Sequence, residues 1–331
     1  MPIAKNTSVP VIAFLVVGIL ALLSPLLFIR IPSGNEWVRA LLDASHGPIF
    51  AIVAMLVAAL LSGRRGSART GAWPDWPLYL KALTISVALG ALIEFLQGFE
   101  GRPPSFFDVM TDTAGALAGL AAWALATRPA MGEPGAAGVP NPWPVVALGL
   151  VGLAFVLWRP MHVAIAYAHR SAAFPSIADF SSARGLDFVT TDGVEAGIAD
   201  MPAPWARGGG ERTLALRYDP QHPPAVQVVE PLGDWRAFSV IAVDLTNAGA
   251  SELSLVLRIL DATHDWSHED RFNLPLVIPP RTRTTVRVAL PAVEAAPATR
   301  RMDMARIANV MIFGRPPAAP GVLYVSRVWL E

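Results

Sequence analysis

The sequence predicts an α-helical transmembrane bundle of about five helices, followed by an all-β sandwich. Long apolar runs fall almost entirely within residues 1–168, and each is near the roughly 20 residues that cross a bilayer. Residues 170–331 instead carry short segments in which apolar and polar residues alternate, as in half-buried strands. The 331 residues are only 16% charged, whereas a soluble domain usually has about 25%.

We predict four segments along the chain. Residues 1–128 form the transmembrane domain, residues 129–142 a Gly/Pro/Ala linker, residues 143–168 a fifth membrane helix, and residues 170–331 the β-sandwich. The expected membrane spans are Val9–Ile29, Gly47–Leu61, Leu78–Phe99, Phe107–Ala126 and Trp143–Trp158.

Basic residues in short loops predict the orientation. The densest cluster is Arg64, Arg65 and Arg69, with Lys81 close behind, so we place this loop and the N-terminus in the cytoplasm. Five spans then put the C-terminal domain on the outer side. Lysine occurs only at Lys5 and Lys81, which we interpret as the codon bias of a bacterium. The prediction is a multi-pass protein of the bacterial inner membrane with an extracytoplasmic β domain.

Composition excludes several classes of function. The chain has 26 basic and 26 acidic residues and no basic patch, so nucleic acid is not expected as a partner. It has no cysteine, which excludes disulfides, thiolate metal sites and a cysteine nucleophile. The sequence identifies no cofactor.

Ionisable residues gather at the outer ends of the predicted spans, where burial makes them costly and therefore functional candidates. Two pairs, Glu94 with Gln97 and Asp108 with Asp112, are each one helical turn apart. As acid–base or anion-holding groups for catalysis we select Glu94, Asp108, His46 and Arg102. As substrate-binding groups we select Gln97, Ser105, Asp112 and Asp43.

Each of these residues also has a structural interpretation. Ser105 and Asp108 have the spacing of a helix N-cap, and Glu94 is able to pair with Arg102 to fix two helices. Gly115 and Gly119 form a small-residue face that suits close helix packing. The carboxylates and histidine also permit an oxygen-rich divalent metal site, although their spacing does not demand one.

The polar residues of this region follow a multi-part motif. It comprises Glu94-x-x-Gln97, Gly101-Arg102, Ser105-x-x-Asp108 and Asp112-x-x-Gly115, preceded by Asp43-x-x-His46. Over residues 10–127 the motif resembles the VanZ-like family. Ala44 stands where that family has lysine, and Asp112 where it has asparagine. The resemblance implies a membrane protein of the bacterial envelope linked to glycopeptide antibiotic susceptibility, and it names no reaction.

Seven alternating runs in the second half predict strands, separated by turn residues such as Asp219-Pro220 and Pro279-Pro280. Many short strands with such turns indicate an antiparallel sandwich or jelly roll. The runs are Thr213–Tyr218, Ala225–Val229, Val240–Leu245, Leu253–Ile259, Thr285–Leu290, Val310–Phe313 and Val322–Trp329.

The order of features in this half is that of a known sandwich. Ala178-Asp179-Phe180, Asp234-Trp235, Arg258-Ile-Leu-Asp261, Asp270-Arg-Phe-Asn273 and the closing run Leu323–Leu330 follow one another. Over residues 174–331 this resembles the galactose-binding-like β-sandwich, the fold of many carbohydrate-binding modules. The resemblance implies glycan binding, with Ser326 where such domains often have aspartate.

A sugar site needs an aromatic platform with polar groups at its rim. One loop between two strands offers both, and its candidates are Asp261, His264, Trp266, Asp270, Arg271 and Asn273. The alternative is structural, with Asp270 and Arg271 paired and Trp266 covering the core. We assign Trp235 to the core, because alternation continues on both sides of it.

The preferred reading is an envelope membrane protein whose outer domain binds glycan or another wall component. Its expected partners are membrane lipids and an envelope glycan or lipid-linked precursor. Two alternatives stay open. One is a membrane enzyme that acts on a lipid-linked substrate through the outer carboxylates. The other is a structural or sensory protein in which these charges only lock helices together.

Overall fold

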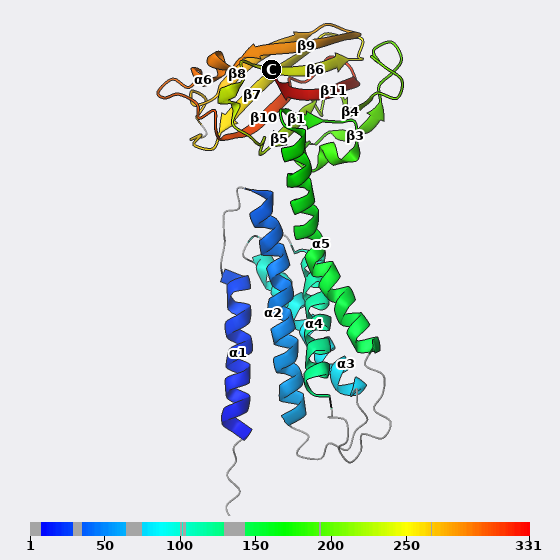
Figure 1. Cartoon of the computed structure of the whole chain (residues 1–331), viewed down its shortest axis with the longest axis vertical. Coiled ribbons are helices and arrows are strands. Elements are labelled where there is room, and N and C mark those ends of the chain that lie inside the picture. Colours follow the sequence, from blue (N-terminus) through cyan, green and yellow to red (C-terminus); the bar gives the residue numbers. More distant parts are fainter. Residues whose placement is uncertain are drawn as a thin grey trace, which may run out of the picture. The chain divides into compact units, whose positions relative to one another are not determined.

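The computed structural model describes residues 8–28, 35–63, 75–99, 101, 104–128, 143–191, 193–265 and 267–331. The chain divides into two compact units, Met1–Ala164 and Ile165–Glu331. The first is helical and the second is mainly β, as predicted (Figure 1).

The helical unit is built from long apolar helices. They are α1 (Ser8–Phe28), α2 (Glu36–Gly63), α3 (Trp76–Phe99), α4 (Phe106–Ala126) and the first part of α5 (Trp143–Ala173). Four of them, α2 to α5, are long and apolar enough to cross a membrane. In α1 the apolar segment Val11–Leu26 is shorter. We predicted about five spans. The described residues contain four helices of spanning length and one shorter apolar helix.

Two helices extend beyond their predicted ends. Helix α2 begins at Glu36 instead of Gly47, because Asn35 caps it by accepting a hydrogen bond from the Val38 N–H at 2.8 Å. Helix α5 continues past Trp158 to Ala173 although Pro160 lies inside it. Hydropathy alone locates the apolar core of such a helix and misses the polar turns that prolong it.

Helices α2 and α4 pack with their backbones in close contact. A methyl group added at Gly115 would lie 2.1 Å from the carbonyl oxygen of Gly47, and one added at Gly119 would lie 2.1 Å from that of Ala51. This confirms the packing role predicted for the two glycines. Helix α5 uses the same device, because a methyl group at Gly152 would lie 2.3 Å from the Ala114 carbonyl oxygen of α4.

The second unit is an antiparallel sandwich of two sheets (Figure 1). The first sheet has the order β3-β4-β11-β6-β9, with β1 also paired to β11, and the second has the order β2-β5-β10-β7-β8. The strands are β1 (Ser176–Asp179), β2 (Val189–Thr190), β3 (Glu195–Asp200), β4 (Arg212–Tyr218), β5 (Ala225–Val229), β6 (Val240–Asn247), β7 (Leu253–Asp261), β8 (Phe272–Ile278), β9 (Thr282–Ala289), β10 (Ile307–Gly314) and β11 (Gly321–Leu330).

The core between the sheets consists of the inward-facing residues of both. Trp235 and Phe180 are fully buried in it, together with leucines such as Leu214 and Leu257. This confirms the assignment of Trp235 to the core. The short helix α6 (Leu290–Glu294) closes one end of the core through Leu290 and Val293.

All seven predicted strands are present, and Leu290 alone falls outside its strand because it begins α6. Four further strands, β1, β2, β3 and β8, were not predicted. Strand β8 contains Pro275, which cannot donate a hydrogen bond and argues against a strand interior. The sheet accommodates Pro275 because β8 is an edge strand, paired only with β7.

The contact between α2 and α4 predicts a steric effect. In the detergent-solubilised protein, Gly115→Ala should lower the free energy of unfolding by about 1–3 kcal/mol. The added methyl group would overlap backbone atoms of Gly47, which can move only if the whole helix shifts. Thermal unfolding followed by circular dichroism measures this. Gly18→Ala is the matched control, since its methyl group would meet only Leu56 Cδ1 at an ordinary 3.8 Å. Equal melting temperatures for the two variants would contradict the packing described.

Candidate functional site

Three helices bring five of the predicted polar residues near one another in the helical unit. His46 Nδ1 lies 3.0 Å from Asp112 Oδ1, and their side chains are 12% and 1% exposed. Glu94 and Asp108 lie within electrostatic range of His46, and Asp43 within range of both His46 and Asp108. We call Asp43, His46, Glu94, Asp108 and Asp112 the helical cluster.

Two buried carboxylates of this cluster keep one oxygen without a hydrogen-bond partner. Glu94 Oε2 accepts from the Ser105 N–H at 2.7 Å, while Glu94 Oε1 has no partner among the described residues. Asp112 Oδ1 faces His46, while its Oδ2 has none either. A methyl group added at Gly90 would lie 2.6 Å from Asp112 Oδ2, so this glycine makes room for the carboxylate. Buried acceptors of this kind are costly unless something binds them.

Ser105 caps α4 as the spacing predicted. Its Oγ accepts from the Asp108 N–H at 3.1 Å. In a capping box, the side chain of Asp108 would in turn accept a hydrogen bond from the Ser105 N–H. Here that N–H donates to Glu94 of α3 instead. The cap therefore joins two helices instead of closing one.

The remaining predicted residues of this unit lie apart from the cluster or outside the description. Gln97 Nε2 donates to the Leu26 carbonyl at 3.1 Å and so links α3 to α1. Arg102 lies outside the described residues, and its pairing with Glu94 or Asp108 stays a prediction. Within the cluster, Asp43 forms an ion pair with Arg159 of α5, and Arg159 Nη2 also lies 3.9 Å from Glu36 Oε2. We did not select Arg159, although a charge within an apolar helix is the signal that would have found it.

In the β unit, Arg300 holds the two predicted carboxylates of the 261–273 loop. Its Nη1 and Nη2 donate to Asp261 at 2.5 and 2.8 Å, and its Nε lies 2.6 Å from Asp270 Oδ1. The Asp261 side chain is fully buried. Burial opposes ionisation of Asp261, but the hydrogen bonds from Arg300 and from the Asp303 N–H prevail and hold the pKa of Asp261 below its usual value.

The predicted alternative pairing of Asp270 with Arg271 is therefore wrong, because Arg300 takes Asp270. His264 Nδ1 lies 2.9 Å from the Asp270 carbonyl oxygen, which makes it part of the same loop framework. Ligand atoms of His264, Asp265 and Asp270 lie within 4.8 Å of one another, but the guanidinium at Asp270 already supplies the positive charge that a cation would bring. Trp266 lies outside the described residues.

The last two predicted residues, Arg271 and Asn273, belong to the outer face of the second sheet. Gln227, Met311, Arg258 and Asn273 stand directly opposite one another across β5, β10, β7 and β8. We call these four the polar row. Arg258 Nε donates to Asn273 Oδ1 at 2.8 Å, and Gln227 Nε2 donates to Asn309 Oδ1 at 2.6 Å. All four side chains are half-buried.

An aromatic side chain borders the polar row. The guanidinium carbon of Arg258 lies 4.6 Å from the centre of the Phe313 ring, a cation–π distance. We did not select Gln227, Arg258, Met311 or Phe313 as glycan contacts. Their signal is the alternation of their strands, which turns these residues away from the core that their neighbours fill.

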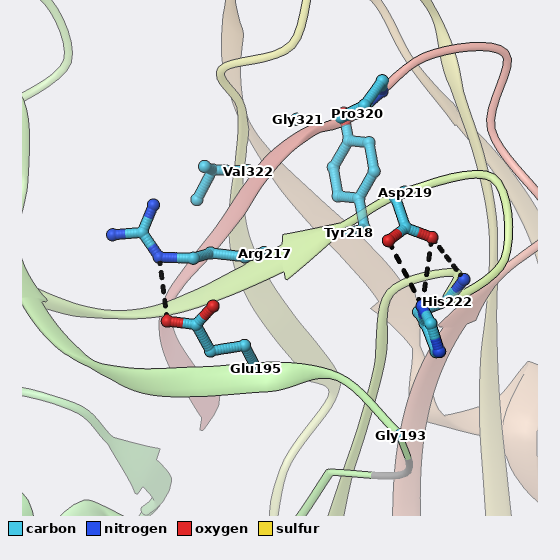
Figure 2. Close-up of a pocket in the computed structure, with 9 residues that line it drawn as sticks. All are labelled: Gly193, Glu195, Arg217, Tyr218, Asp219, His222, Pro320, Gly321 and Val322. Atoms are coloured by element: carbon cyan, nitrogen blue, oxygen red, sulfur yellow. Dashed lines mark hydrogen bonds and ion pairs between the residues drawn. The ribbon is translucent and has the colours of Figure 1, made fainter.

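A hollow of about 610 Å³ lies along β3, β4 and β11 of the first sheet (Figure 2). Its charged groups satisfy one another. Arg217 Nε lies 3.4 Å from Glu195, and His222 Nδ1 lies 3.1 Å from Asp219, as the dashed lines in Figure 2 show. Among the described residues of this hollow, each charged side chain is paired, so we place no functional site there.

No protein-family model and no curated protein matches the sequence. Similar solved structures include an exo-β-agarase, with 12% identity and a TM-score of 0.38 over 47% of this chain and 24% of that chain, about a quarter of its length. A family 11 carbohydrate-binding module from Clostridium thermocellum, in complex with a mixed-linked tetrasaccharide, matches with 11% identity and a TM-score of 0.32 over 44% of this chain and 88% of its own. A family 28 module specific for non-crystalline cellulose matches with 10% identity and a TM-score of 0.34 over 48% and 94%.

The Arg300 contacts predict a pH-dependent contribution to stability. Because the folded pKa of Asp261 is depressed, the stabilisation is complete above the unfolded pKa of about 3.9 and is lost as pH falls through the folded value. Arg300→Met should cost about 3 kcal/mol at neutral pH, since it leaves a buried carboxylate without its partner. The variant and the parent should converge only as pH falls through the depressed folded pKa of Asp261, because protonation then removes the charge in both proteins.

Hydrogen exchange of the β7 amides in the full-length protein measures both effects. Arg287→Met is the control, because Arg287 pairs only at the surface with Glu331. A deficit in Arg300→Met that stays constant across the acidic range would show that the ion pair is not its cause.

Proposed function

We propose that this chain is a multi-pass membrane protein of the bacterial cell envelope whose β-sandwich binds a glycan along the outer face of its second sheet. The observation that carries the proposal is the polar row, in which four strands present Gln227, Met311, Arg258 and Asn273 side by side. The face supplies amide and guanidinium groups for sugar hydroxyls, with apolar surface from Met311 and Phe313 between them.

The dimensions of this face suit an extended ligand. Neighbouring strands lie about 4.8 Å apart, so four strands present contacts over roughly 14 Å. Arg258 and Gln227 are each fixed by a hydrogen bond to an asparagine, which reduces the entropy lost when a ligand binds. A glycan lying across the strands meets one polar group at each of three positions. The sequence resemblance to galactose-binding-like domains supports the same assignment.

The membrane part of the proposal rests on the helices and on the motif. Four apolar helices of spanning length support an integral membrane location, and the basic residues 64–69 support an outward-facing β domain. The VanZ-like resemblance over residues 10–127 supports a place in the envelope and a link to glycopeptide susceptibility. In this proposal the helical cluster recognises a lipid-linked or amphiphilic envelope molecule.

The polar row provides the test of glycan binding. The double variant Gln227→Ala/Asn273→Ala should bind about tenfold more weakly to any polysaccharide that the full-length protein retains, because two hydrogen-bonding groups are lost. Affinity electrophoresis or calorimetry of the protein in lipid nanodiscs measures this. Arg287→Ala on the outer face of the other sheet is the control. Failure of the unaltered protein to bind any of a broad set of envelope and plant polysaccharides would contradict the proposal.

A second candidate function is an enzyme that acts on a lipid-linked envelope substrate. The observation that favours it is the buried His46–Asp112 pair beside two carboxylate oxygens that lack partners. Such a set provides a proton carrier and a base at the end of a helical bundle. Arg102 would hold an anionic headgroup.

Conservative variants separate this enzyme from a purely structural cluster. If the cluster is catalytic, Glu94→Gln and Asp112→Asn should each lower turnover of extracted envelope lipids at least a hundredfold while the melting temperature changes little. If the charges only lock the helices together, the same variants should melt at lower temperature and leave lipid turnover and antibiotic susceptibility unchanged. Unchanged turnover in both variants would eliminate the enzyme.

A further inference from the structure

Two arginines stand together on the outer face that carries the polar row. Phe272 points into the core, so Asn273 after it points outward, where Arg258 contacts it. Arg271 directly precedes β8. Burial lowers the pKa of the Arg258 guanidinium, and the nearby charge of Arg271 lowers it further. Two like charges therefore lie near one another on a half-buried surface.

Neither arginine has an acidic partner. An ion pair requires a nitrogen–oxygen distance of 4.0 Å or less. In the described part of the chain, no carboxylate oxygen lies that close to the guanidinium group of Arg258 or Arg271. The nearest candidates along the chain, Asp261 and Asp270, are both taken by Arg300. Arg271 Nε is buried and has no acceptor among the residues that the structure describes. Most other arginines of the sandwich, including Arg207, Arg217, Arg236, Arg283, Arg287, Arg301 and Arg306, do form ion pairs.

The arrangement is unfavourable without a ligand and is resolved by an anion. Two adjacent cations repel one another, and a buried N–H without an acceptor adds a desolvation cost. The planar guanidinium fork matches the two oxygens of a carboxylate, sulfate or phosphate group. Asn273 and Phe313 fix the orientation of Arg258, so its remaining N–H groups are available in one direction.

We propose that the polar row binds an acidic glycan, and that Arg258 and Arg271 together hold an anionic substituent of the sugar. This inference rests on the proposed glycan-binding function and narrows it to a ligand class. Gln227 lies at the other end of the polar row, and Asn309 is its hydrogen-bond partner. Their amides contact neutral hydroxyls of adjacent sugar units. The shared chemistry is an anionic oxygen group, supplied by uronate carboxylates or by sulfate or phosphate esters.

The test compares matched charged and neutral polysaccharides on the full-length protein in nanodiscs of zwitterionic lipid. One arm uses polygalacturonate against its methyl ester, a second uses chondroitin sulfate against desulfated chondroitin, and a third uses wall teichoic acid for phosphodiesters. We expect at least one charged form to bind tenfold or more tightly than its neutral counterpart. Binding should weaken as salt is raised from about 0.05 to about 0.5 M, because exposed charges are screened.

Arginine variants assign the effect to the two guanidinium groups. Arg258→Gln and Arg271→Gln should each weaken binding of the charged glycan about tenfold. Arg271→Gln, which lies outside the polar row, should leave binding of the neutral form unchanged. Arg258→Lys should restore only part of the affinity, since it keeps the charge and loses the fork. Arg287→Gln on the other sheet should bind like the parent. Melting temperatures of all variants control for folding.

The outcomes separate the two levels of the proposal. Equal binding of charged and neutral glycans, with no effect of either arginine variant, would overturn the acidic class and leave glycan binding intact. Absence of binding to every polysaccharide would overturn both. Retention by vesicles of anionic lipid, with no affinity for soluble acidic glycans, would assign the arginines to a membrane surface and also overturn the inference.

Discussion

The close approach of α2 and α4 sets the geometry of everything polar in the helical unit. Gly115 lies against the backbone of Gly47, which is the residue directly after His46. Asp112, one turn before Gly115, is thereby brought to His46, and the two side chains meet at 3.0 Å. Larger side chains at the glycine positions would move the helices apart and break this pair. A packing feature of the apolar face therefore determines the distance between two ionisable groups.

The aspartate at position 112 has a physical meaning in this arrangement. An aspartate at this position brings a carboxylate to the imidazole of His46, whereas an asparagine would offer only an amide group. Gly90 of α3 is the accompanying adjustment, because no larger residue would leave room for the carboxylate. The chain thus contains a self-consistent histidine–carboxylate pair. Asp43 has its own cation, Arg159 of α5.

Sequence reasoning predicted the parts of this protein that depend on local patterns. The apolar helices, the seven alternating strands and the buried Trp235 all follow from periodicity within one segment. Strands β2 and β3 are too short or too polar to show that periodicity, and β8 contains a proline that is tolerated only at a sheet edge. Edge position is a property of the whole sheet and is not visible in one segment.

The sites show the same division between local and distant information. The motif spacing correctly indicated that residues of α2, α3 and α4 would gather. It did not indicate partners far along the chain, and Arg159 and Arg300 were both missed for this reason. Arg300 also changes the meaning of the 261–273 loop, whose acids it neutralises. Arg258 and Arg271 on the neighbouring sheet face then have no carboxylate partner among the described residues.

The position of β11 in the first sheet constrains the order in which the sandwich assembles. This strand lies between β4 and β6 and also pairs with β1, so it is the middle of its sheet although it comes last in the chain (Figure 1). During synthesis, the strands on either side must wait with unpaired edges until residues 321–330 emerge. Pairings between such distant segments close large loops and are slow to form. The first sheet is therefore completed by its most distant pairings, and β4 and β6 each keep an unpaired edge until β11 inserts between them.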